Sequence, residues 1–377
     1  MIRHFIREEL LPRLVYLPWF LAWIWLLFIT PIHFFRRWNQ KSTGSSSCIC
    51  IEAGERGWQS IEFKELYQSA CEYLDTDHVV KFAVKHDQDY VAQVKSVLRS
   101  HPISHYVYDP RTGIQQWWSG LWQSLQVATL LQQHHVIPIV LLTDLSVRIW
   151  RAQSAVVSAR KGVVVSFMSA KIMHPIFPHK RLLGPSLMPF SVRTKTALDS
   201  MINIRQLNDK PRAIFTGSLY EPRTSILRQV ESGVKARGGN FDVLGRIIGT
   251  SRVADEEYWS RLINADIVFT TSVQMQQEGT DWIRIPHFLY RYLEVLVSGS
   301  LLVAQDVPSV RRYLTPGLHY VPYETPADAV ELILRYLDDP PARAKIARQG
   351  KERVDSLINA RSFWMLIDSF LGKEAIA

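Results

Sequence analysis

Short apolar runs alternate with amphipathic helical patterns from residue 48 almost to the end of the chain, and this alternation most constrains the fold. Uninterrupted apolar runs are typical of strands that are buried on both faces of a parallel sheet. Parallel strands need a crossover connection, which is usually a helix and runs right-handed. We therefore expect an α/β fold of doubly wound parallel sheets, with strands at residues 48–51, 79–84, 105–108, 136–142, 162–167, 213–217, 241–245, 265–271, 301–304 and 320–323.

The chain has 377 residues, which is enough for two domains and an additional segment. The sequence Leu-Met-Pro-Phe at 187–190 closes the first half, and the polar stretch 191–211 is predicted to be a connector. The expected division is therefore a membrane anchor with a linker at 1–44, one domain at 45–190 and a second domain at 191–377.

The N-terminal segment contains a long run without charge, from residue 14 to residue 35. A helix of about 20 apolar residues can span a hydrocarbon core of about 30 Å. Trp19, Trp23 and Trp25 are residues of the type enriched at membrane interfaces. Three interpretations remain open for this run: a single span, an interfacial or re-entrant anchor, and a buried core helix. The Ser-rich and Gly-containing stretch 41–47 is predicted to tether it to the rest of the chain.

The charge and cysteine content narrow the classes of partner and compartment. The net charge of +9 favours anionic partners such as phosphorylated ligands and acidic lipid surfaces. No long basic run is present, which argues against nucleic acid. The three cysteines, Cys48, Cys50 and Cys71, cannot build a disulfide framework and favour a reducing compartment, so the body is expected on the cytoplasmic side of a membrane. No metal-ligand pattern is visible, and no metal or other cofactor is expected.

The stretch 284–306 is predicted to form a loop, a helix and a buried strand. Pro286 suits the first turn of the helix, and Gly299 suits its end. Arg291 and Glu294 are three residues apart, so they share one face near the helix start. Arginine is suited to phosphate and a carboxylate is suited to sugar hydroxyls, so the pair fits a nucleotide diphosphate-sugar. The alternative for the pair is an exposed salt bridge within the helix.

The pattern Arg-x-x-Glu-x-x-x-x-Gly, formed by Arg291, Glu294 and Gly299 before an apolar strand, resembles the donor-site motif of GT-B glycosyltransferases. The sequence is most similar to the spore-maturation-protein-like branch of the family 1-type glycosyltransferases, and more loosely to exostosins. The resemblance implies two Rossmann-like domains that face a cleft. It also implies that Glu294 holds the ribose or sugar of the donor and that Arg291 lies beside the diphosphate. Many retaining relatives carry a second Glu eight residues earlier, where this chain has Pro286.

Further donor-binding candidates precede this motif. Residues 213–223 resemble the strand-glycine-loop-arginine opening of the second domain in the same family. Gly217 would let the backbone approach a ligand closely. Arg223 could reach a phosphate, and a solvated side chain is the alternative. Thr271 follows a strand and is expected to point toward the central cleft.

Two residues of the first half are candidates for catalysis. Asp144 follows the strand at 136–142, where it could act as a base toward the acceptor or simply cap the next helix. His174 lies in a Pro-containing loop, where it could be catalytic or merely exposed.

These features predict a membrane-anchored glycosyltransferase that moves a sugar from a nucleotide-sugar to a glycan or lipid-linked acceptor. Residues 45–190 would then form the acceptor domain, and residues 191–377 the donor domain. The alternative is a non-catalytic, nucleotide-binding-like scaffold of a glycan assembly complex. Neither function involves nucleic acid.

Overall fold

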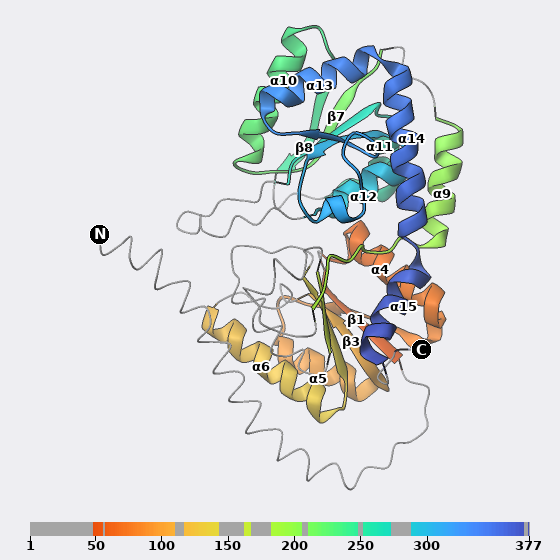
Figure 1. The fold of residues 1–377 in the computed structure, drawn as a ribbon. Helices are drawn as coiled ribbons and strands as arrows, with labels where there is room; N and C mark the ends of the chain where they lie inside the picture. The colour runs from red at the N-terminus through yellow and green to blue at the C-terminus, as the bar shows by residue number, and fades with distance from the viewer. Residues whose placement is uncertain are drawn as a thin grey trace. The chain divides into compact units, whose positions relative to one another are not determined.

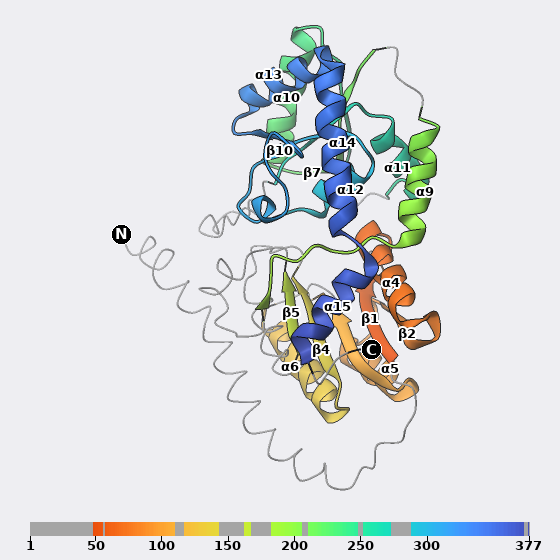
Figure 2. The same cartoon turned by 45° about the vertical axis from the view of Figure 1, so that its right-hand side comes forward.

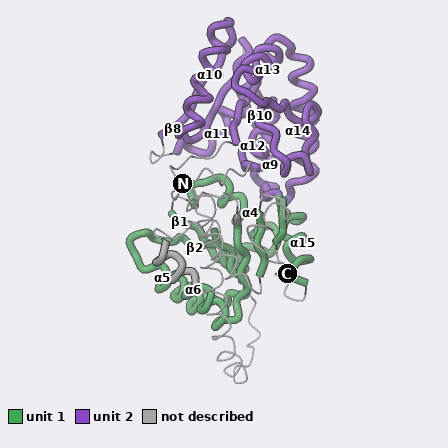
Figure 3. Tube along the Cα trace, turned by 60° about the vertical axis from the view of Figure 1, so that its left-hand side comes forward, with its two compact units in different colours: residues 1–186, 360–377 green, residues 187–359 purple. Residues whose placement is uncertain are grey.

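The computed structural model describes residues 48–55, 57–109, 117–142, 162–166, 182–205, 210–247, 252–272, 288–372 and 376. Helices and strands alternate along these residues, as the sequence predicts (Figure 1). They form two compact units (Figure 3). Unit 1 contains the described residues up to Ser186 together with those from Ala360 onward, and unit 2 contains the described residues of 187–359.

Unit 1 is built around a six-stranded sheet in which every strand pair is parallel. The strand order is β2-β1-β3-β4-β5-β6. The strands are β1 (Cys48–Gly54), β2 (Val79–Val84), β3 (Ile103–Tyr108), β4 (Ile137–Leu142), β5 (Val163–Ser166) and β6 (Leu182–Leu183). The helices are α4 (Ile61–Leu74), η3 (Thr76–His78), α5 (Tyr90–Ser100), α6 (Trp117–Gln133) and α15 (Ala360–Leu371).

Unit 2 is built around a five-stranded sheet, again with parallel pairing throughout. The strand order is β11-β10-β9-β7-β8. The strands are β7 (Ala213–Leu219), β8 (Phe241–Ile247), β9 (Ile267–Thr270), β10 (Leu301–Gln305) and β11 (Val321–Tyr323). The helices are α9 (Val192–Asn203), α10 (Arg223–Ala236), α11 (Asp255–Ile263), α12 (Tyr290–Val297), η5 (Val310–Arg312), α13 (Pro326–Asp338) and α14 (Pro340–Leu357).

The two sheets share one topology. In each, the first strand of the unit lies between the second and the third, which gives the order 2-1-3-4-5 of doubly wound folds. The connections on the two sides of the first strand leave in opposite directions, so the order reverses next to that strand. Ligands of such folds bind outside the carboxyl ends of the strands at this reversal point. The reversal points lie between β1 and β3 in unit 1 and between β7 and β9 in unit 2.

The sheet of unit 2 carries helices on both faces, as parallel strands require. Alternate residues of a strand point to opposite faces. Phe215 and Val303 belong to the buried cluster that α10 and α13 complete on one face, and these two helices lie side by side (Figures 1 and 2). Helix α12 packs against β9 and β10. The strand ends are thereby held in fixed positions by buried apolar side chains.

The stretch predicted as a connector contains a helix instead. Ser191 caps α9, because its hydroxyl accepts a hydrogen bond from the Thr194 N–H at 3.1 Å. The helix is polar because it is largely exposed, and Leu198 is its only buried residue. Its charged side chains pair with α14, with Lys351 Nζ 2.8 Å from the Asp199 carboxylate. A polar helix of this kind lacks the apolar periodicity by which helices are predicted.

Helix α12 is shorter than the sequence predicts. It begins at Tyr290, and Leu289 is its N-cap residue without a side-chain hydrogen bond. Pro286, which was expected in the first turn, lies outside the described residues. The end of the helix is as predicted: Gly299 has φ +76°, and its N–H donates to the Leu296 carbonyl at 3.1 Å. This left-handed conformation costs glycine little free energy because glycine has no β-carbon, and it ends the helix.

The last described helix, α15, belongs to unit 1, whereas the second domain was predicted to extend to residue 377. Trp364 is fully buried, and its indole N–H donates to the Ser69 hydroxyl of α4 at 3.1 Å. Tyr73 of α4 donates to the Asp368 carboxylate at 2.6 Å. A buried tryptophan with a satisfied N–H ties the end of the chain to unit 1.

Within the described part of the chain, no helix combines the length and the apolar character needed to cross a membrane. The predicted anchor at 14–35 lies outside the described residues.

The first prediction concerns this C-terminal helix. Trp364→Ala should lower the free energy of unfolding by about 3–5 kcal/mol, because it empties a buried aromatic site and removes the hydrogen bond that Ser69 accepts. Met365→Ala is the matched control, since Met365 is exposed on the same helix. Urea unfolding gives the size of the loss, and hydrogen exchange locates it. Protection should fall in α4 and persist in α10; a loss confined to α10 and α13 would contradict the assignment of α15 to unit 1.

Candidate functional site

The reversal point of unit 2 is held together by Arg223, the first residue of α10. Its guanidinium donates to the Ser218 carbonyl at 3.0 Å and to the Thr271 carbonyl at 3.3 Å. The same group lies over the Tyr220 ring, 4.2 Å from its centre. Arg223 therefore joins the end of β7 to the segment that follows β9. The structure gives this predicted phosphate ligand a role in shaping the site.

Gly217 lies near the end of β7 with φ +148°, a conformation that other residues rarely adopt. A β-carbon at this position would be 3.2 Å from a ring carbon of Phe215 and 3.8 Å from Nη2 of Arg291. Residues 217 and 291 are far apart in sequence, and the fold brings them together. The glycine leaves the strand end open beside the guanidinium.

Arg291 and Glu294 lie on one face of α12, as the spacing predicts. Nε of Arg291 is 3.3 Å from Oε2 of Glu294. The side chains are 20% and 9% exposed, so this is a largely buried ion pair and not the exposed one considered as the alternative. Charges at such sites are screened less than charges in water, so their placement matters more.

Tyr258 of α11 completes this group. Its hydroxyl donates to Oε2 of Glu294 at 2.8 Å and accepts a hydrogen bond from Nη1 of Arg291. The guanidinium also lies over the tyrosine ring, 4.9 Å from its centre. Tyr258 was not among the site residues predicted from the sequence. The sequence contains only a weak indication of this role. Tyr258 lies in a helix with an apolar face, and a tyrosine that is buried there needs a hydrogen-bond partner for its hydroxyl.

The charges of this group are well defined at neutral pH. Burial lowers the pKa of Arg291, but Tyr258 and Glu294 more than offset this and hold the pKa above its ordinary value. Burial also raises the pKa of Tyr258 well above its ordinary value; Arg291 opposes this shift, and Glu294 adds to it. The guanidinium is therefore charged, and the phenol keeps the proton that it donates to Glu294.

Thr271 and Gly299 have structural roles that are visible in their contacts. The hydroxyl of Thr271 donates to Oε1 of Gln305 at 3.3 Å, and Ser272 donates to the same oxygen through its N–H and its hydroxyl, both at 2.9 Å. These bonds link the end of β9 to the end of β10. Gly299 lies two residues after Val297, the last residue of α12, and about 12 Å along the helix axis from Arg291 at 1.5 Å per residue. Asp144 and His174 lie outside the described residues.

The reversal point of unit 1 carries a different chemistry. Glu52, at the end of β1, is fully buried. Tyr90 donates to its two oxygens at 3.0 and 2.9 Å, and Tyr106 donates to Oε2. The pKa of Glu52 is raised to about 8, and burial is the largest cause of this rise. The hydrogen bonds from the two tyrosines oppose the rise, and the charge of Asp109 adds to it. This carboxyl group therefore retains its proton through most of the neutral range.

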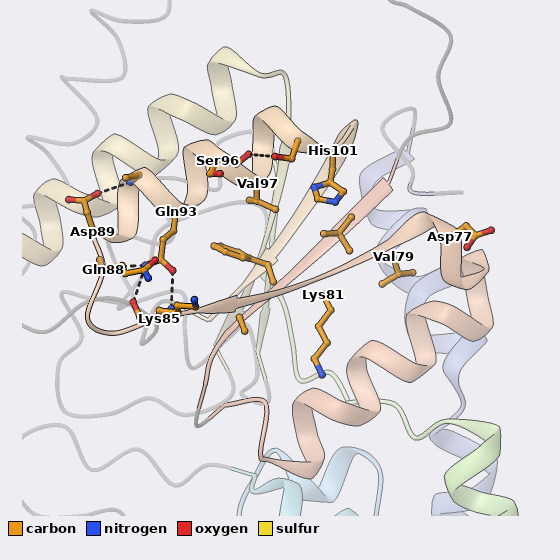
Figure 4. Close-up of a pocket in the computed structure, with 15 residues that line it drawn as sticks. Asp77, Val79, Lys81, Lys85, Gln88, Asp89, Gln93, Ser96, Val97 and His101 are labelled. Carbon is orange, nitrogen blue, oxygen red and sulfur yellow. Dashed lines mark hydrogen bonds between the residues drawn. The ribbon is translucent and has the colours of Figure 1, made fainter.

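Unit 1 also has a groove along the outer strand β2, with a volume of about 860 Å³ (Figure 4). Its polar groups largely satisfy one another. The Gln93 amide pairs with the N–H and the carbonyl of Lys85, both at 2.9 Å, and Asp89 caps α5. The groove is lined by β2, α5 and their ends, and neither Glu52 nor Asp109 lines it. We therefore do not place the functional site there.

The described residues include no group of three or more His, Cys, Asp and Glu side chains that could hold a metal ion. The three cysteines are all free.

Comparison with known proteins connects this site to a family. Residues 223–363 match the family model described as glycosyl transferase-like. The fold resembles Anabaena HepE, solved with UDP-glucose, at 11% sequence identity and a TM-score of 0.58 over 86% of this chain and 99% of that chain. It also resembles sucrose-phosphate synthase from Thermosynechococcus elongatus, at 14% identity and a TM-score of 0.58 over 87% and 98%. A glycosyltransferase from Rickettsia africae gives 9% identity and a TM-score of 0.56 over 87% and 99%. No curated protein matches the sequence. The predicted resemblance to GT-B glycosyltransferases is confirmed.

The second prediction concerns Glu52. Its pKa of about 8 in the folded state exceeds the ordinary 4.5, so the folded state holds a proton that the unfolded state releases. The stabilisation is fully present below pH 4.5 and is lost as the pH rises to 8, by about 1.4 kcal/mol per pH unit. Glu52→Gln should abolish this slope, whereas Glu55→Gln, at an exposed position, should preserve it. Urea unfolding between pH 5 and pH 9 measures the slope; equal slopes in the wild type and Glu52→Gln would refute the assignment.

Proposed function

Because this chain has the GT-B fold and a glycosyl transferase-like domain at residues 223–363, we propose that it transfers a sugar from a nucleotide-sugar to a glycan or lipid-linked acceptor. The observation that carries the proposal is the juxtaposition of Gly217, Arg291 and Glu294 at the reversal point of unit 2. Doubly wound sheets bind their ligands at this position. HepE, which shares the fold, was solved with UDP-glucose.

The remaining hydrogen-bonding capacity of the pair fits a nucleoside diphosphate. Nε and Nη1 of Arg291 are engaged by Glu294 and Tyr258, whereas Nη2 has no hydrogen-bond partner among the described residues and lies beside Gly217. Within the same residues, Oε2 of Glu294 is engaged and Oε1 is not. The N–H groups of Nη2 are thus available to phosphate oxygens, and Oε1 is available to accept from a hydroxyl group.

Arg291 would also assist the departure of the nucleotide. When the bond between the sugar and the diphosphate breaks, negative charge accumulates on the phosphate oxygens. A guanidinium that is already fixed and charged stabilises this charge without reorganising. Its fixed partners, Tyr258 and Glu294, keep it in place before the donor binds.

The third prediction tests the pair. Glu294→Gln removes a charged acceptor, and a charge-assisted hydrogen bond contributes about 1.5–3 kcal/mol, so kcat/KM should fall about 10- to 150-fold. Arg291→Lys should also reduce turnover, because lysine keeps the charge without the planar fork. The assay incubates the protein with a panel of nucleotide-sugars and measures released nucleoside diphosphate. Unchanged turnover in Glu294→Gln would overturn the donor site.

The matched controls are Glu231→Gln and Arg237→Lys, which change the same residue types in exposed ion pairs of unit 2. Both should retain full turnover. Since Arg291 and Glu294 are largely buried, melting must be measured for every variant. Wild-type protein that binds a nucleotide-sugar without any turnover would favour the scaffold function instead.

The anchor belongs to the same proposal. The uncharged, Trp-containing run at 14–35 would hold the protein at a membrane, where lipid-linked acceptors reside. The free cysteines and the supply of nucleotide-sugars favour a body on the cytoplasmic side. A reporter fused after Ala377 that is active only in the exported compartment would contradict this orientation.

The fourth prediction tests membrane association. The full chain should sediment with membranes in the absence of detergent, and a chain that starts at Ser45 should remain in the supernatant. Sedimentation is measured by ultracentrifugation at low and at high salt, because a purely electrostatic attachment would be lost at high salt. A full chain that stays in the supernatant would rule out the anchor.

A further inference from the structure

Tyr258 lies at the centre of the candidate donor site, yet the proposed chemistry assigns it no contact with the ligand. It comes from α11, and its side chain is about as buried as that of Glu294. Its hydroxyl contacts both Glu294 and Arg291 of α12. Its ring carries the guanidinium of Arg291 on one face. Three contacts from one side chain therefore determine where the functional groups of α12 lie.

The direction of these hydrogen bonds is fixed by the chemistry of the groups. A guanidinium can only donate, and an ionised carboxylate can only accept. A phenol can do both at once. Arg291 must therefore donate a hydrogen bond to Tyr258, and Tyr258 must donate one to Glu294. No other assignment of protons satisfies all three groups.

This order determines which atoms are left for a ligand. Tyr258 occupies Nη1 of Arg291 and shares Oε2 of Glu294 with Nε of Arg291. Among the described residues, Nη2 and Oε1 are then the atoms without a hydrogen-bond partner. Arginine and carboxylate groups otherwise prefer a bidentate pairing with two parallel hydrogen bonds. In the structure this pairing is not formed: only Nε of Arg291 approaches Glu294, and the phenol holds Nη1 of Arg291 and Oε2 of Glu294 in a different arrangement.

We propose that Tyr258 is a positioning residue of the donor site, which holds the Arg291–Glu294 ion pair at a single contact so that Nη2 of Arg291 binds the diphosphate and Oε1 of Glu294 binds a hydroxyl group of the donor. This inference rests on the proposed function. Removal of the phenol oxygen lets the two side chains close into a bidentate pair, which consumes the atoms that the ligand requires. The loss therefore falls on donor binding, since the folded protein exchanges one set of internal hydrogen bonds for another.

The test compares Tyr258→Phe with Tyr290→Phe. Phenylalanine keeps the ring under the guanidinium and removes only the hydroxyl. Tyr290 is the matched control, because it is equally buried and its hydroxyl donates to the Pro189 carbonyl at 3.3 Å. The probes are uridine, guanosine and adenosine diphosphate, and calorimetry measures their dissociation constants. Tyr258→Phe should bind the preferred diphosphate about 10- to 50-fold more weakly, and Tyr290→Phe should bind it within about twofold of the wild type.

A double-mutant cycle separates positioning from a general structural effect. If Tyr258 acts through Arg291, then Tyr258→Phe combined with Arg291→Lys should weaken binding by much less than the product of the two single losses. Turnover adds a second readout: KM for the donor should rise in Tyr258→Phe, and kcat should fall with it, because the same guanidinium stabilises the departing diphosphate. An unchanged KM would contradict the positioning of the donor.

The outcomes distinguish this inference from the proposed function. Wild-type protein that binds none of the three diphosphates would overturn the proposed function, and the role of Tyr258 with it. Binding by the wild type together with unchanged binding by Tyr258→Phe would overturn the role of Tyr258 alone. Single losses that multiply in the double variant would show that Tyr258 acts independently of Arg291, which also overturns it.

Discussion

Parallel pairing of the strands is the constraint on which the other features depend. A parallel pair requires a crossover, usually a helix, that returns the chain to the same edge of the sheet. All carboxyl ends then gather at one edge, and the reversal of strand order leaves an opening there. The strand order therefore brings three features together at this edge: Gly217, Arg223 and the segment after β9. Helix α12 enters the same place because it precedes β10, which pairs with β9.

The two units have the same strand order, but the groups at their reversal points differ in charge. In unit 2 the reversal point carries two arginines, and one carboxylate is held between an arginine and a phenol. In unit 1 the corresponding position carries a buried glutamic acid that is satisfied by two phenols. An anion would be attracted to the first, whereas the protonated carboxyl group of the second carries no charge through most of the neutral range. Tyrosine hydroxyls serve in both places as the groups that satisfy a buried carboxyl, because a phenol combines an apolar body with one donor.

Strands were more predictable than helices in this chain, for a physical reason. The run 301–304 is apolar throughout because β10 is covered on both faces, and such a run has few alternative structures. Helix α9 escaped prediction because it is exposed along most of its surface and buries only Leu198. The ion pair of α12 followed from spacing alone. The burial of this ion pair and its contact with Tyr258 could not be predicted from spacing, because Tyr258 comes from another helix and only tertiary packing brings it next to Arg291 and Glu294.

Because α15 belongs to unit 1, the last residues to be synthesised are residues of unit 1. Unit 1 contains the described residues up to Ser186 and then those from Ala360, so unit 2 is inserted into it. During synthesis, all residues of unit 2 are present once residue 359 has been added, whereas α4 still lacks the tryptophan that covers it. Domains generally fold as units as they emerge. The inserted unit can therefore fold first, and the unit that begins earlier in the sequence closes last, with the apolar face of α4 awaiting the final helix.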